Sequence, residues 1–196
     1  MPVYLHALKL IANNFKKPLA VALVGPFTLA VELAGATDMA RNIIRNPDFV
    51  DEMMDFTTDV VLNFASEVIK SGARLIQLSE PSAVILSPRM FEQYVATNLR
   101  KIFKELDAFK VLHICGDTTY ILAEMLNCGV EGLSLDQLMD LPGVAPKIPD
   151  NIVLIGNIDP IQVMAGMPPG RCGKRLKTLL REWNLMPIIC HLLAVT

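Results

Sequence analysis

The sequence predicts an α/β fold built on a parallel β-sheet, and three observations predict it. Short apolar runs alternate with longer amphipathic stretches along the 196-residue chain. The apolar runs lack polar alternation, which is typical of strands buried on both faces of a parallel sheet. Several runs end in polar, turn-forming residues, where functional groups gather in parallel α/β folds. Pattern alone leaves two architectures open, a doubly wound sheet and part of a (β/α)8 barrel.

Each strand is expected at an apolar run that stops at a turn. The six expected strands cover residues 18–24, 74–80, 110–115, 130–135, 152–156 and 187–190. The expected helices cover residues 5–15, 28–35, 47–70, 88–109, 118–127 and 171–183. The helix at 47–70 is the clearest, because its apolar positions recur at three- and four-residue spacing behind Pro47. No GxGxxG or GxxxxGK[ST] motif follows any of these strands, which disfavours nucleotide binding.

Composition narrows the class of protein. Hydrophobic residues make up 52% of the chain and charged residues 19%, enough apolar surface for a large core. A net charge of −2 with scattered Lys and Arg gives no electrostatic reason to expect nucleic acid. No apolar run reaches the roughly 18 residues of a membrane span, and the N-terminus does not resemble a signal peptide. We therefore expect a cytoplasmic protein whose four cysteines are reduced thiols or metal ligands.

The stretch VLHICGD contains the pair that most suggests a metal site. His113 and Cys115 are two residues apart at the end of a strand, so their side chains point to the same face. Imidazole nitrogen and thiolate sulfur both suit zinc, at about 2.0–2.3 Å. The alternative is a half-buried histidine beside a small apolar cysteine.

Two ligands do not hold zinc, so a third donor is needed from elsewhere in the chain. The candidates are Cys190, Cys128, Cys172, Glu80 and Asp136. Cys190 is favoured because it ends the last expected strand, whereas Cys128 and Cys172 lie at helix ends on the opposite side. Three protein ligands leave the fourth position of zinc open, as in catalytic sites.

Two carboxylates also follow strands. Glu80, before Pro81, can orient a ligand or act as a general base, or it can be an N-cap or a surface acid in a loop. Asp136 in SLDQ can likewise orient a ligand or act as a general base, or it can form a turn. Asn157 and Asp159 in GNIDP are expected to form a turn and the N-cap of the next helix.

Six motifs, in this order, identify a family. GPFTLAVELAG, GARLIQLSEPSA, LSPRMFEQYV, VLHICGDTTYILAEM, VEGLSLDQ and IVLIGNIDP resemble the uroporphyrinogen decarboxylase superfamily over residues 18–169. They look most like its corrinoid-dependent branch, the methylcobamide:coenzyme M methyltransferases. The resemblance implies a (β/α)8 TIM barrel that is incomplete, covering about strands 3 to 8. Residues 1–196 would then form one partial barrel domain that lacks the N-terminal strands and has an atypical C-terminus, because Ile189 stands before Cys190 where the family has glycine.

The resemblance also implies an activity. Zinc would be held by His113, Cys115 and Cys190, with Glu80 and Asp136 as catalytic residues lining the mouth of the barrel. A methyl group would pass from a methylated corrinoid, carried by a separate corrinoid protein, to a small-molecule acceptor. The acceptor would be a thiol such as coenzyme M, or tetrahydrofolate. Two alternatives remain: a metal-free decarboxylase of tetrapyrrole acetates, which needs basic groups in the mouth, and an inactive fragment that only binds a corrinoid protein.

Overall fold

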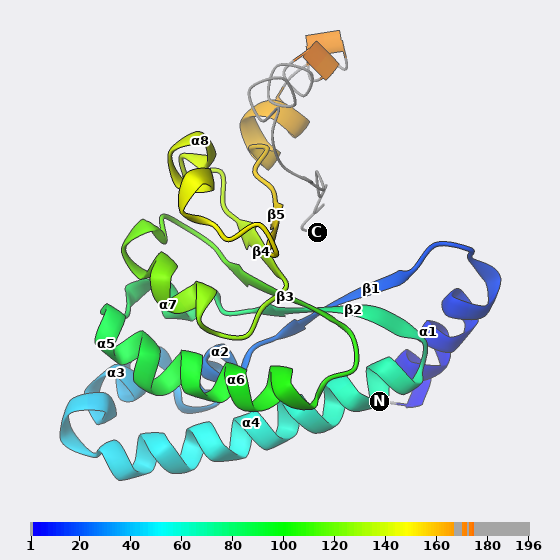
Figure 1. The fold of residues 1–196 in the computed structure, drawn as a ribbon. Helices are drawn as coiled ribbons and strands as arrows, with labels where there is room; N and C mark the ends of the chain where they lie inside the picture. Colours follow the sequence, from blue (N-terminus) through cyan, green and yellow to red (C-terminus); the bar gives the residue numbers. More distant parts are fainter. Residues whose placement is uncertain (1, 167–169, 172, 175–196) are drawn as a thin grey trace.

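The computed structural model describes residues 2–166, 170–171 and 173–174. Its centre is a sheet of five parallel strands (Figure 1). These are β1 Leu19–Val24, β2 Ala73–Ser79, β3 Phe109–Ile114, β4 Gly132–Leu135 and β5 Val153–Ile155. The strands are hydrogen-bonded in chain order, β1-β2-β3-β4-β5. A doubly wound sheet reverses its strand order, so this order is that of a barrel wall.

Helices connect successive strands, and the larger ones lie together along one side of the sheet (Figure 1). The α-helices are α1 Pro2–Asn14, α2 Pro26–Ala34, α3 Ala36–Arg45, α4 Pro47–Lys70, α5 Pro88–Met90, α6 Thr97–Glu105, α7 Leu122–Leu126 and α8 Leu141–Val144. The shorter 3-10 and π segments are η1 Pro81–Ile85, η2 Phe91–Ala96, η3 Thr119–Ile121, η4 Ala145–Lys147 and η5 Pro160–Ala165. Within the described part of the chain, no helix is long and apolar enough to cross a membrane.

Most expected elements are confirmed. The five described strands match their expected ranges to within two residues at each end, and α4 has the expected bounds, 47–70. The expected strand at 187–190 lies outside the described residues. The helix expected at 88–109 is confirmed over 88–105, where α5, η2 and α6 follow one another without a break and η2 is a π turn; it ends four residues early, and Phe109 already belongs to β3. Helix α3 was not expected; it follows Gly35, whose φ of +85° separates it from α2.

The two faces of the sheet differ at β1. Val21 and Leu23 are buried, whereas Ala20, Ala22 and Val24 between them are exposed. Paired residues of neighbouring parallel strands point to the same face, and the register joins Val24 to Ser79 and Ser79 to His113. His113 therefore lies on the face turned away from the helices that bury Val21 and Leu23, the inner face of a barrel wall.

Candidate functional site

The site forms where the carboxyl ends of β3, β4 and β5 meet, and we call this region the mouth. His113 is the next-to-last residue of β3, and Cys115 follows the strand directly. Their side chains lie together, with His113 Nε2 3.2 Å from Cys115 Sγ. A strand's two-residue period brings the pair to one face, as the spacing predicts.

The ring of His113 is oriented by the neighbouring strand. Its Nδ1 lies 3.0 Å from the carbonyl oxygen of Ser134 in β4. Because a carbonyl oxygen only accepts hydrogen bonds, Nδ1 donates there, and in the neutral ring Nε2 then presents its lone pair to the Cys115 thiol. Metal-binding histidines are typically held in this way, with one nitrogen donating to a carbonyl and the other facing the ion.

The surroundings of Cys115 favour its neutral thiol over the thiolate. Desolvation, and secondly the negative charge of Asp136, raise the pKa of the Cys115 thiol. A cation beside the sulfur would reverse this preference, since a coordinating thiol loses its proton. The pair therefore offers a nitrogen and a sulfur at a separation that one zinc ion can bridge.

Asp136 borders the pair from β4. Its Oδ1 accepts a hydrogen bond from the backbone amide of Leu138 at 2.9 Å, which is the turn expected of an aspartate at a strand end. The side chain is partly buried, and its charge acts on Cys115. Asp136 thus forms the expected turn, and its catalytic role stays a prediction.

Glu80 has a different environment. Its side chain is fully buried, and its two carboxylate oxygens accept hydrogen bonds from the backbone amides of Phe27 at 2.9 Å and Thr28 at 2.7 Å. Both amides belong to the first turn of α2, where the helix dipole favours an anion. Burial raises the pKa of Glu80 to about 7, against the hydrogen bonds from Thr28 and Phe27 that lower it. These contacts favour the helix-capping alternative, and a catalytic role for Glu80 stays a prediction.

The main chain of Glu80 nevertheless touches the site. Its amide donates to the carbonyl oxygen of His113 at 2.8 Å. Glu80 therefore connects the start of α2 with the strand end that carries His113.

The other candidate ligands fall into two groups. Cys128 is buried with 0% exposure beyond α7, its thiol donates to the carbonyl of Glu124, and burial raises its pKa to about 12. Cys172 and Cys190 lie outside the described residues. Among the residues that are described, no three His, Cys, Asp or Glu side chains lie close enough together to hold a metal ion. The third ligand expected at Cys190 therefore stays a prediction.

Sequence reasoning missed the contacts that join the three strand ends. Asn157, expected as a turn residue, donates from Nδ2 to the carbonyl oxygens of Asp136 and Met139. The sulfur of Met139 accepts from the backbone amide of Thr118, just beyond Cys115. The only signal available was the polar GN pair after β5. Asp159, by contrast, caps η5 as expected, accepting from the amides of Ile161 and Gln162.

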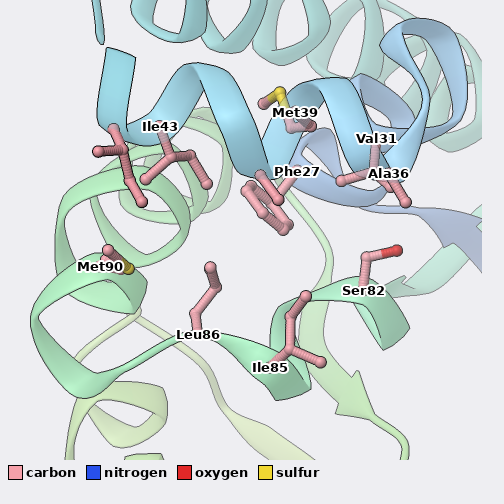
Figure 2. A pocket seen from close by; sticks show the side chains of 11 residues that line it. Phe27, Val31, Ala36, Met39, Ile43, Ser82, Ile85, Leu86 and Met90 are labelled. Carbon is pink, nitrogen blue, oxygen red and sulfur yellow. The ribbon is translucent and has the colours of Figure 1, made fainter. Parts of the chain in front are cut away.

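An apolar pocket of about 260 Å³ lies beside α2 and η1 (Figure 2). Its walls come from α2, α3, and the η1–α5 segment, and Ser82 is the one polar side chain among apolar ones. The lining residues are Phe27, Val31, Ala36, Met39, Ala40, Ile43, Ile44, Ser82, Ile85, Leu86 and Met90. Glu80 holds two of these walls together, because it precedes η1 and binds the first turn of α2.

Known proteins share this architecture. The methylcobamide:CoM methyltransferase MtbA of Methanosarcina mazei is 30% identical over 200 residues, which cover 98% of this chain and 58% of that protein. A solved structure of a methyltransferase from Methanosarcina mazei matches with a TM-score of 0.88 and 26% identity, over 100% of this chain and 60% of that one. A uroporphyrinogen decarboxylase of Thermodesulfovibrio yellowstonii is 24% identical over 164 residues, 81% of this chain and 48% of that protein.

The chain thus spans between about half and three fifths of the length of these relatives. Together with the consecutive order of five parallel strands, the structural match confirms a partial (β/α)8 barrel. The sequence matches the family described as uroporphyrinogen decarboxylase (URO-D) over residues 1–189, and the chain belongs to that family.

Proposed function

We propose that this chain carries the zinc site of a methyltransferase that moves a methyl group from a methylated corrinoid to a thiol such as coenzyme M. One observation carries the proposal: His113 Nε2 and Cys115 Sγ lie 3.2 Å apart, with Nδ1 engaged by the Ser134 carbonyl. Its support from relatives is that MtbA, 30% identical, is named for methyl transfer from methylcobamide to CoM. The decarboxylase relative is less similar, at 24% identity.

The proposed chemistry assigns each side chain a task. His113 Nε2 and Cys115 Sγ hold the ion, with Cys190 as the proposed third ligand. Bound zinc supplies the Lewis acidity that keeps an acceptor thiol ionised near neutral pH. The acceptor's sulfur then bonds to the methyl carbon, and the electron pair of the broken carbon–cobalt bond stays on the corrinoid. Asp136 borders the acceptor's position and orients it, and the methylated corrinoid arrives on a partner protein. Tetrahydrofolate is the alternative acceptor.

The test combines metal content with turnover. We expect the purified chain to bind one equivalent of zinc and to transfer methyl groups from methylcobalamin to a thiol. His113→Ala and Cys115→Ser are expected to weaken zinc binding by at least about 100-fold and to abolish transfer, because each removes a ligand. Cys190→Ser tests the third ligand in the same assay. The matched control is Cys128→Ala, a buried cysteine outside the mouth, which is expected to keep both properties.

The competing functions predict other results. A folded wild-type chain without zinc above background contradicts the proposal. Decarboxylation of a tetrapyrrole acetate without zinc would favour the lyase instead. Zinc-independent binding of a corrinoid protein, without turnover by the wild type, would favour the inactive binding module.

A further inference from the structure

The loop that carries Cys115 is anchored at both ends. Upstream it continues β3, which ends at Ile114. Gly116, with φ of +92°, then turns the chain, a conformation that glycine adopts without strain. Only Gly116 and Asp117 separate Cys115 from Thr118, which is 0% exposed. The position of the Cys115 sulfur relative to His113 therefore depends on where Thr118 is fixed.

Thr118 is fixed by a thioether. The backbone amide of Thr118 donates to Met139 Sδ at 3.1 Å, and the Thr118 hydroxyl lies 3.5 Å from the same sulfur. The hydroxyl of Thr119 approaches it as well, at 3.6 Å. Met139 is 3% exposed and Thr118 0%, so the two contacts of Thr118 are made away from water. A thioether is a weak acceptor, but a buried amide deprived of it has no water to replace it.

Met139 is in turn held by Asn157, in the segment after β5. Its amide donates to the carbonyl of Asp136 at 3.0 Å, which closes the turn after β4. Both carbonyls, of Asp136 and Met139, accept from Nδ2 of Asn157 at 2.9 and 2.7 Å. The two protons of the Asn157 side-chain amide are thereby donated to the first and last residues of one turn. Gly156 allows this approach, because a Cβ there would lie 2.5 Å from the carbonyl oxygen of Leu135.

We infer that Met139 and Asn157 are positioning residues that set the Cys115 loop against His113, by a chain of contacts from the segment after β5 through the turn after β4 to the loop after β3. Neither side chain touches the proposed ion. The expected effect on metal affinity rests on the proposed function. The anchoring of the loop rests on the geometry alone. Residues that hold metal ligands in place typically change metal affinity by about 10- to 100-fold when mutated.

The experiment compares two buried methionines. Met139→Leu removes the sulfur at nearly constant volume, and Met125→Leu makes the same change in α7, where Met125 is 0% exposed. Two quantities are measured: hydrogen exchange of the Thr118 amide in metal-free protein, and zinc affinity by competition with a chelator. For Met139→Leu we expect exchange at least about 10-fold faster and zinc binding about 10-fold weaker. Met125→Leu is expected to change neither, even where it lowers the melting temperature equally.

Two further variants separate positioning from general stability. Met139→Gln keeps an acceptor, its side-chain oxygen, and is expected to retain the protection of the Thr118 amide although it buries a polar group. Asn157→Ala changes the segment after β5 and is expected to speed the exchange of the Thr118 amide and to weaken zinc binding, as Met139→Leu does. It keeps the inference testable if Met139→Leu does not fold.

The outcomes distinguish the inference from the proposed function. If the wild type binds no zinc, the proposed function fails, and the hydrogen-exchange rate of the Thr118 amide alone tests the anchoring. A faster rate in Met139→Leu than in Met125→Leu supports the anchoring, and equal rates overturn it. If the wild type binds zinc and Met139→Leu binds it as tightly, Met139 does not position the ligand loop, whatever its exchange rate.

Discussion

At the scale of single residues, Glu80 follows a strand end, where functional groups are expected, but its carboxylate caps α2. Its charge is fully buried, and the side chain of Thr28 and the two amides of α2 offset part of the loss of water. Burial outweighs these hydrogen bonds and raises the pKa of Glu80 from its ordinary 4.5 to about 7. In the folded chain this side chain therefore changes its charge near neutral pH.

This shift predicts a pH dependence of stability. A carboxyl with a raised folded-state pKa destabilises the fold when charged, so its penalty is absent below pH 4.5, grows as pH rises, and is complete above about 7. The free energy of unfolding should fall by about 3 kcal/mol over that window through Glu80 alone. Glu80→Gln should remove this slope, as measured by urea unfolding at pH 4.5, 6 and 7.5. Glu105→Gln, at an exposed glutamate, is the control and should keep the wild-type slope.

Equal slopes for Glu80→Gln and the wild type would contradict the assignment. At pH 4.5 the variant should be close to the wild type in stability, because Glu80 is then itself neutral, with one carbonyl oxygen and one hydroxyl facing the two α2 amides.

At the scale of elements, α2 begins without a cap from its own sequence. Gly25 supplies no side chain, Pro26 occupies the first helical position, and the acceptor for the first-turn amides comes from Glu80. The fit is close: a Cβ on Gly25 would lie 2.6 Å from Glu80 Cγ. Glycine at this position is therefore required by the buried carboxylate rather than by backbone conformation, since its φ is −81°.

Gly25→Ala should displace that carboxylate. We expect a loss of about 1–3 kcal/mol in the free energy of unfolding, typical of overpacking at a buried site. Chemical denaturation measures it. Gly170→Ala is the matched control, because a Cβ at Gly170 meets no atom within 4 Å. A Gly25→Ala variant as stable as this control would show that Glu80 is free to move.

At the scale of the whole molecule, the larger helices lie along one face of the described sheet (Figure 1). Val21 is 6% exposed, whereas Ala22, the next residue of β1, is exposed on the opposite face. The same face carries His113 further along the sheet. Barrel walls of this kind place their functional groups at the carboxyl ends of the strands.

Lysine substitutions should report which face is covered. Val21→Lys should destabilise the chain by about 3 kcal/mol or more, because it buries an unpaired charge against the helices. Ala22→Lys should change stability by no more than about 0.5 kcal/mol, as exposed substitutions usually do. Thermal or urea unfolding of the two variants measures the difference. Similar losses in both would mean that the inner face is covered in this chain.

The sequence alone determined the local features. Apolar runs and amphipathic periods placed five strands and α4, because burial and backbone period act on neighbouring residues. The two-residue spacing likewise brought His113 and Cys115 to one face. Only the tertiary structure decided which partners distant residues meet: Glu80 with amides 53 and 52 positions away, and Met139 with Thr118 21 positions away. Such contacts depend on the order and register of the strands. No local pattern specifies these, because they are set by the packing of the whole sheet against its helices.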